Sequence, residues 1–187
     1  FLKIYIDELK KLISIDNEKI QAFVMEKPSY THVQDKKISK DGIHIVFPNI
    51  IVEPRVQYLA RHNTITNKLC KDLFKTIKAK NKLSDIFDKC VIETNNWLMY
   101  GCNKPTSTKY LLTHIFKYDN QNILKKIDIK KFDNKQLIKE MSIRNKKSQM
   151  YNLTEEEKGN ISESYETILK LDKKNGPLKK KRKLKPK

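Results

Sequence analysis

A lysine and a histidine on one short apolar segment are the side chains of this sequence best suited to chemistry. Residues 40–44 read Lys-Asp-Gly-Ile-His, and the apolar run continuing from them predicts a strand over 43–47 that is buried on both faces. On an extended strand Lys40, Gly42 and His44 share one face. The lysine offers a point charge, the histidine a hydrogen bond to a phosphate oxygen, and the glycine room for close approach of a ligand. Such a pair can meet a triphosphate, but on the spacing alone a solvated lysine beside a half-buried core histidine is the commoner explanation.

A carboxylate and a second lysine follow later in the chain. Asp88 precedes a segment at 95–101 that reads Asn-Asn-Trp-Leu-Met-Tyr-Gly, and Lys104 follows this segment. Carboxylate and phosphate oxygens are the ligands that Mg²⁺ prefers. Trp97 to Tyr100 is predicted to form a strand; these two aromatic side chains could stack on bases, or Trp97 could belong to the core.

The two segments resemble, in the right order, the second and third motifs of the archaeo-eukaryotic primase superfamily. The string from 40 to 48, Lys-Asp-Gly-Ile-His-Ile-Val-Phe-Pro, and the segment 95–101 are most similar to the primase part of the primase–helicases of nucleocytoplasmic large DNA viruses. The segment 23–28, Phe-Val-Met-Glu-Lys-Pro, fits the same group. The resemblance covers residues 1–118. It implies a DNA primase, a template-directed nucleotidyltransferase that uses Mg²⁺ or Mn²⁺, nucleoside triphosphates and a single-stranded DNA template, with a fused or associated helicase.

The resemblance also assigns roles to individual residues. His44 would contact the phosphates of the incoming nucleotide, with Lys40 and Lys104 as further triphosphate contacts. Asp88 would be the third carboxylate that helps to hold the catalytic metals. Two positions depart from the pattern: Gly42 stands where many members carry serine, and Leu98 where many carry arginine.

The first motif of the family, an Asp-x-Asp or Asp-x-Glu pair on an earlier strand, has no clear counterpart. Upstream of His44 the one such pair is Asp16 with Glu18. The other interpretation places the pair before Phe1, in a longer parent protein. The piece would then be unable to catalyse by itself, because one carboxylate cannot hold two metals. A non-catalytic nucleic-acid-binding module that keeps the primase fold is therefore the alternative function.

The charge of the chain favours a nucleic-acid partner. The formal net charge is +18, and residues 173–187 contain nine Lys or Arg and no acid. Each phosphate that such a chain neutralises releases counterions. An anionic membrane surface is the rival partner, but the tail lacks aromatic side chains to bury, and no apolar run has transmembrane length, so we expect no membrane partner. Solubility alone is the plain alternative.

Several basic residues are candidates for phosphate contacts. Arg55 and Arg61 lie on a predicted helix and could touch template phosphates, or belong to a solvated face. In the tail the candidates are Lys180, Lys181 and Arg182. The stretch 178–185 resembles a nuclear localisation signal, and a non-specific DNA arm or a linker would have the same composition. The expected location is the cytoplasm or nucleus of an infected host cell.

The pattern of apolar residues predicts an α+β protein, because strands and helices mix without regular alternation. Residues 1–118 are predicted to form the C-terminal part of a primase catalytic core, a small sheet flanked by helices. Residues 119–172 form a polar, mainly helical extension, and residues 173–187 a disordered basic tail. The expected strands cover 20–25, 43–47, 97–100 and 110–118. The expected helices cover 3–14, a long stretch from 53 or 54 broken near 64–66, a helix capped by Ser84, 133–142, and 154–171 with a capping box at Thr154.

Overall fold

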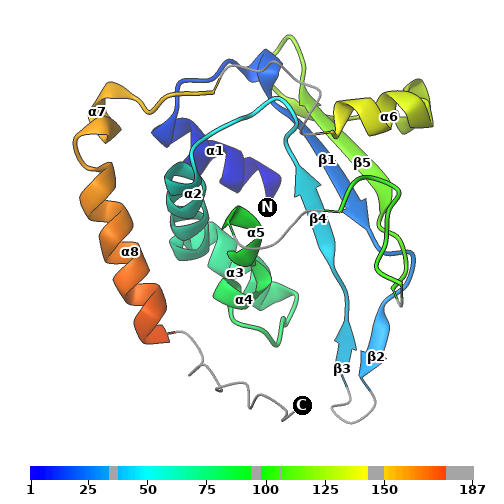
Figure 1. Ribbon diagram of the computed structural model, residues 1–187, viewed down its shortest axis with the longest axis horizontal. Helices are drawn as coiled ribbons and strands as arrows, with labels where there is room; N and C mark the ends of the chain where they lie inside the picture. Colours follow the sequence, from blue (N-terminus) through cyan, green and yellow to red (C-terminus); the bar gives the residue numbers. More distant parts are fainter. Residues whose placement is uncertain (34–37, 94–97, 106, 143–149, 176–187) are drawn as a thin grey trace, which may run out of the picture.

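The computed structural model describes residues 1–33, 38–93, 98–105, 107–142 and 150–175. It is an α+β structure, as predicted, with a four-stranded antiparallel sheet flanked by helices. In Figure 1 the helices α1 to α5 gather with α8 on one side of the sheet, and α6 lies apart from them beside β5. Within the described residues no helix is long and apolar enough to cross a membrane.

The strands of the main sheet run in the order β4-β1-β5-β6. Their bounds are Gln21–Glu26 for β1, Ile43–Val46 for β4, Leu111–Tyr118 for β5 and Leu124–Ile127 for β6. The strands predicted over 20–25 and 110–118 are confirmed as β1 and β5. In β1 the four inner residues are buried, as expected for a central strand with a continuous apolar run.

The strand that carries His44 forms an edge of this sheet, and the prediction that it is buried on both faces is wrong. Among the described strands, β4 has a neighbour, β1, on one side only. Ile43 is 57% exposed and the next three residues are half-buried. The apolar run of β4 therefore forms the edge strand of the sheet and not a central strand.

Lys40 belongs to a different strand from His44. It ends β3 (Ile38–Lys40), which pairs with β2 (Thr31–Val33) in a separate two-stranded sheet. The break falls at Asp41, whose carboxylate accepts a hydrogen bond from the Gly42 backbone N–H at 2.7 Å. The prediction that Lys40 and His44 share one strand is thus wrong, because this local hydrogen bond competes with regular strand pairing.

The N-terminal helices follow the predicted pattern with one change. The helix expected over 3–14 is confirmed as α1 (Leu2–Leu12), and the long stretch divides at Asn67 into α2 (Pro54–Thr66) and α3 (Lys68–Thr76). The Asn67 side chain caps α3 by accepting from the Leu69 N–H. A helix capped by Ser84 is not formed. Instead α4 (Leu83–Ile86) begins after Lys82, and α5 (Cys90–Glu93) follows separately.

The predicted strand over 97–100 is not formed in its described part. Residues 94–97 lie outside the described residues. Leu98 and Met99 have no regular structure and Tyr100 begins a turn. This segment therefore reaches the sheet as a loop.

The chain after 118 is integrated with the chain before it. β6 pairs with β5, and α6 (Asn134–Glu140) begins at a capping box between Asp133 and Gln136. The helix predicted from Thr154 is two helices, α7 (Glu155–Lys158) and α8 (Ile161–Asn175), and the Thr154 side chain makes no capping hydrogen bond. Two short 3₁₀ turns, η1 (Asn17–Lys19) and η3 (Ile129–Lys131), complete the described elements.

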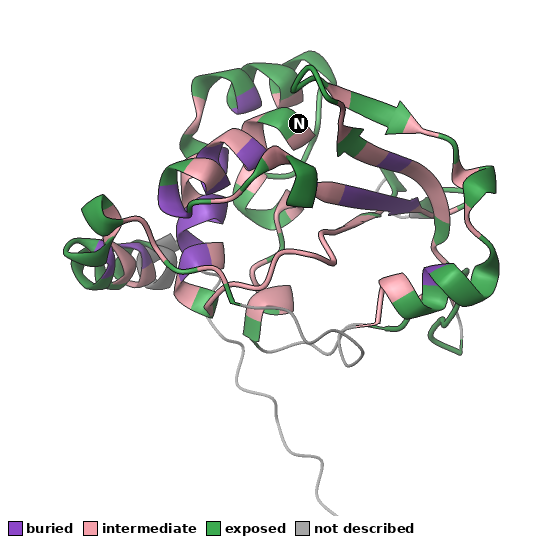
Figure 2. Ribbon diagram, turned by 90° about the horizontal axis from the view of Figure 1, so that it is seen from above, coloured by how far each residue is buried: buried purple, intermediate pink, exposed green. Residues whose placement is uncertain are grey.

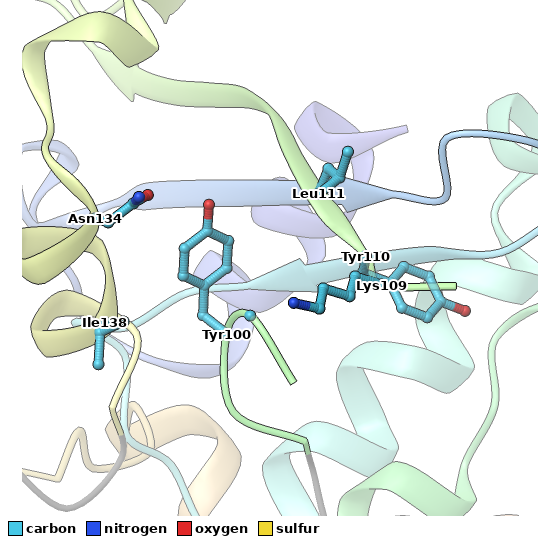
Figure 3. A pocket seen from close by; sticks show the side chains of 7 residues that line it. Tyr100, Lys109, Tyr110, Leu111, Asn134 and Ile138 are labelled. Carbon is cyan, nitrogen blue, oxygen red and sulfur yellow. The ribbon is translucent and has the colours of Figure 1, made fainter. Parts of the chain in front are cut away.

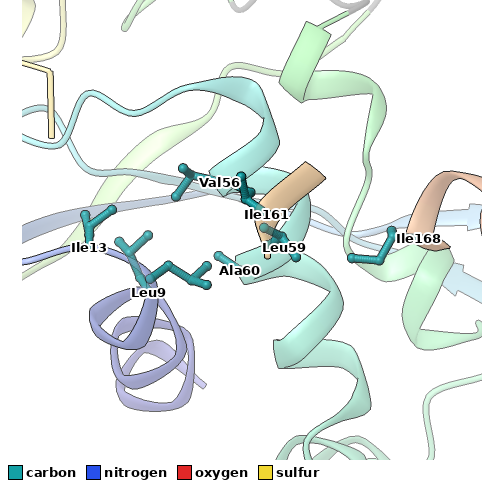
Figure 4. Close-up of a cluster of buried hydrophobic side chains, with 8 residues drawn as sticks. Leu9, Ile13, Val56, Leu59, Ala60, Ile161 and Ile168 are labelled. Atoms are coloured by element: carbon teal, nitrogen blue, oxygen red, sulfur yellow. The ribbon is translucent and has the colours of Figure 1, made fainter. Parts of the chain in front are cut away.

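Two apolar clusters hold these elements together. The larger joins α1, α2 and α8 through buried side chains that include Leu9, Leu59 and Ile168 (Figure 4). The smaller joins the sheet to α6 through Phe23, Ile115 and Leu137. Figure 2 shows the buried residues gathered in the inner strands and where helices meet, with mostly exposed residues elsewhere.

Candidate functional site

His44 is held against an aromatic side chain at the edge of the sheet. It pairs across the strands with Met25, so the two side chains share a face of the sheet. Its imidazole stacks on the Tyr110 ring, with the centroids 3.8 Å apart and the planes 14° from parallel. Burial, and next the positive charge of Lys27, lower the pKa of His44 from its ordinary value. The imidazole is therefore neutral near pH 7, with one nitrogen that donates and one that accepts.

The space beside Gly42 is filled by the Tyr110 hydroxyl. A Cβ atom at Gly42 would lie 2.5 Å from the Tyr110 Oη, closer than such atoms approach. The glycine was predicted to let a ligand approach the backbone; in the structure a side chain of the same chain takes that place. The Lys27 ammonium lies 5.5 Å from the centroid of the same ring, within range of a cation–π contact. Burial, and next the Asp41 charge, raise the pKa of Tyr110, so its hydroxyl stays protonated.

Lys40 and Lys104 are both exposed and lie on separate segments. Lys40 ends β3 in the small hairpin. Lys104 lies in the loop before β5, where its carbonyl accepts from the Ser107 N–H at 3.0 Å and from the Asn103 side chain at 2.9 Å. The loop backbone at Lys104 is thus held by local hydrogen bonds, and the residue is exposed.

Asp88 lies on the exposed loop between α4 and α5. Its carboxylate accepts from the Cys90 N–H at 2.9 Å, which turns the chain into α5. Arg61 of α2 holds the same loop. Its guanidinium donates to the Phe87 carbonyl at 2.6 Å and to the Ser84 carbonyl at 2.8 Å.

The prediction that Arg61 touches template phosphates is therefore wrong for this conformation. The residue is 6% exposed, and its guanidinium donates to the carbonyls of Phe87 and Ser84 instead of facing the surface. Arg55, the other candidate of α2, is half exposed and forms an ion pair with Glu53 at 2.8 Å, so its role stays a prediction. Lys180, Lys181 and Arg182 lie outside the described residues.

A complete metal site is not formed by the described residues alone. Among them no group of three or more His, Cys, Asp or Glu side chains is arranged to hold a metal ion. Asp88 supplies one carboxylate. Asp16 and Glu18 are exposed at η1, which precedes β1, whereas His44 pairs near the end of β1. A six-residue strand separates the two ends by roughly 20 Å, so this acidic pair does not lie with His44.

A cavity of about 320 Å³ lies next to this region, between the loop at Tyr100, the start of β5 and α6. Figure 3 shows the Lys109 side chain pointing toward Tyr100, while the Tyr110 ring is directed away from Tyr100. Asn134 and Ile138 of α6 close the other side. The cavity therefore borders Tyr110 and the first residue of β5, Leu111.

Two residues of the site, Tyr110 and Lys27, were not identified from the sequence. Signals for both existed: Lys27 lies in the segment 23–28 that carries part of the resemblance, and Tyr110 begins a predicted strand. What sequence reasoning could not supply is the pairing of β1 with β4 and with β5, which brings the two residues to His44.

Comparison with known proteins identifies the family of this chain. The chain is 32% identical over 118 residues to a putative helicase of Acanthamoeba polyphaga mimivirus. The shared stretch is 62% of this chain and 12% of that much longer protein. Residues 1–116, which include His44, Asp88 and Lys104, match the family described as the C962R protein N-terminal AEP domain. The chain therefore belongs to this family of AEP domains, the archaeo-eukaryotic primase type, as the motifs at 40–44 and 88–104 led us to expect.

Proposed function

We propose that this chain contains the nucleotide-binding part of a viral DNA primase that acts with a fused or associated helicase. The observation that carries the proposal is His44, a neutral imidazole held on an edge strand inside the region that matches the AEP family. The mimivirus relative is named as a helicase, and this name supports a helicase partner for the parent protein.

In this proposal the triphosphate of a nucleotide lies against the edge of the sheet. The His44 imidazole donates a hydrogen bond to a phosphate oxygen, and the ammonium groups of Lys40 and Lys104 neutralise phosphate charge. Lys40 lies four residues before His44, and both lysines are exposed. The reaction class is template-directed nucleotidyl transfer, in which a primer 3′-hydroxyl attacks the α-phosphate and pyrophosphate leaves.

Asp88 would supply one carboxylate to Mg²⁺ or Mn²⁺, which in such sites stabilises the attacking and leaving oxygens. The described residues do not complete the ligand set. This incomplete ligand set favours the second candidate function, a nucleic-acid-binding module that keeps the fold without catalysis. In both cases the basic chain binds single-stranded DNA through its phosphates, with Arg55 and the tail residues Lys180, Lys181 and Arg182 as contacts. Either protein would act in the cytoplasm or nucleus of an infected host cell.

The His44→Ala substitution tests the triphosphate role. We expect it to weaken the binding of a nucleoside triphosphate about tenfold, because a hydrogen bond to a charged group is lost. Titration calorimetry of the 187-residue chain would measure this affinity. The matched control is His32→Ala, which removes an exposed histidine from β2 in the separate hairpin.

Asp88→Asn in the same assay separates the two candidate functions. For the primase we expect this variant to lose the part of nucleotide binding that depends on added Mn²⁺, and a parent protein with this change to lose primer synthesis. Nucleotide affinity that is indifferent to both His44 and Mn²⁺, with DNA binding retained, would favour the non-catalytic module.

A further inference from the structure

The side chains of His44 and Lys27 both contact the Tyr110 ring, and the three residues lie at the ends of three different strands. His44 comes from β4, Lys27 follows the last residue of β1, and Tyr110 precedes the first residue of β5. The imidazole stacks on the ring at 3.8 Å between centroids, and the Lys27 ammonium lies 5.5 Å from the ring centroid. No local turn links these residues, so their contact depends on the register of three paired strands.

The hydroxyl end of Tyr110 is held in place as well. It occupies the space that a side chain at Gly42 would fill, with the Oη 2.5 Å from the position of an added Cβ. The ring atoms Cζ and Cε1 are farther away, at 3.4 and 3.6 Å. Among the described glycines only Gly101 has a positive φ. Gly42 is therefore required by the space that the Tyr110 hydroxyl takes, and its backbone conformation would accept alanine.

A histidine on an edge strand has several side-chain rotamers available. A stacked ring restricts the imidazole to one plane, so that its nitrogens face a fixed direction. Ordering this side chain before a ligand arrives lowers the entropy lost on binding. The contact between the rings is thus suited to preparing His44 for a phosphate.

We propose that Tyr110 is a positioning residue, which holds the His44 imidazole in the plane needed to meet a triphosphate, and that Gly42 makes room for it. This inference rests on the proposed role of His44 in nucleotide binding. Tyr110 acts through His44 and need not touch the nucleotide. Its aromatic ring, and not its hydroxyl, carries the effect.

Two substitutions at Tyr110 test whether the ring is required. Tyr110→Phe keeps the stacked ring, and Tyr110→Leu removes it. By NMR we expect the imidazole protons of His44 to show an upfield ring-current shift in the wild-type chain and in the Phe variant, and to lose it in the Leu variant. We expect the nucleotide affinity to change in parallel with this shift. It should be unchanged in the Tyr110→Phe variant and about fivefold weaker in the Tyr110→Leu variant.

A double substitution tests the role of Gly42. Gly42→Ala forces the Tyr110 ring to move, so we expect it to reduce both the ring-current shift and the nucleotide affinity. Adding Tyr110→Phe removes the 2.5 Å contact and leaves the contacts at 3.4 and 3.6 Å, so the double variant should recover both readouts. A general loss of stability would not be reversed by removing one hydroxyl.

The outcomes distinguish the inference from the proposed function. If Tyr110→Leu loses the ring-current shift and still binds nucleotide like the wild-type chain, the positioning role is overturned and the role of His44 stands. If Tyr110→Phe is as weak as Tyr110→Leu, the ring is not what matters and the inference fails. If the wild-type chain binds no nucleotide, the proposed function fails and the inference fails with it, whatever the NMR spectra show.

Discussion

At His44, burial and a neighbouring ammonium group act on the pKa in the same direction. Both disfavour the imidazolium form, so the pKa in the folded chain lies below the ordinary value of 6.5. A group whose pKa is lowered on folding contributes stability above its unfolded pKa, and this contribution is lost as the pH falls through the folded pKa. The contribution of His44 is therefore present near pH 7 and disappears in mildly acidic solution, below pH 6.5.

The Lys27→Met substitution should raise the pKa of His44 toward its ordinary value. The change removes the repulsion between two cations and leaves the burial, which is the larger cause, in place. An NMR titration of the His44 imidazole would measure the pKa directly. Lys40→Met is the matched control, because it removes the same charge from an exposed position on β3. Equal shifts in both variants would contradict the specific contact between Lys27 and this site.

At the scale of elements, Arg61 joins α2 to the loop that carries Asp88. The side chain comes from a helix of the large apolar cluster and donates to the carbonyls of Ser84, which lies in α4, and of Phe87, which directly follows α4. Asp88 follows directly, and its own carboxylate turns the chain into α5. An arginine for which the sequence left a phosphate contact and a solvated face open thus supports the loop that carries Asp88.

The Arg61→Ala substitution should therefore lower the free energy of unfolding by about 2–3 kcal/mol, because it leaves partly buried carbonyls without their donors. Urea unfolding followed by circular dichroism would measure the change. Arg55→Ala, six residues earlier on α2, is the control. The side chains of Arg55 and Glu53, which form an ion pair, are each 43% exposed. We therefore expect this variant to lose less than about 1 kcal/mol of stability. An Arg61→Ala chain with unchanged stability and a weaker, less salt-dependent affinity for DNA would instead restore the phosphate role.

At the scale of the whole molecule, the chain beyond the family match takes part in the core. The match ends at residue 116, before the end of β5, and β6 completes the hairpin with it. Ile161 and Ile168 of α8 are 4% exposed and pack with side chains of α1 and α2. The predicted boundary at 118 thus falls between two paired strands, and the residues on its two sides share both apolar clusters.

The Ile168→Ala substitution tests this integration. We expect the free energy of unfolding to fall by about 3 kcal/mol, since removing a large aliphatic side chain leaves a cavity in the cluster. Leu171→Ala on the same helix is the control, because Leu171 is 43% exposed and its loss should cost under about 1 kcal/mol. A separate low-temperature unfolding step for α8, with no change in the main transition of the Ile168→Ala chain, would show that α8 is an appendage instead.

The class of the fold, most of the elements and the order of the motifs could be predicted from the sequence. Apolar periodicity and capping residues are local properties, so α1, β1, β5 and α6 could be predicted from a few neighbouring residues. The motif around His44 could be identified in the same way, because spacing along the chain is visible without a structure.

Which residues contact each motif depends on the tertiary structure. Strand pairing placed His44 on an edge and brought Tyr110 and Lys27 to it from residues that are distant in the chain. The hydrogen bond at Asp41 separated Lys40 from His44, and the packing of α2 turned Arg61 inward. Contacts between distant residues depend on register and burial, which are properties of the assembled sheet and core and not of any short segment.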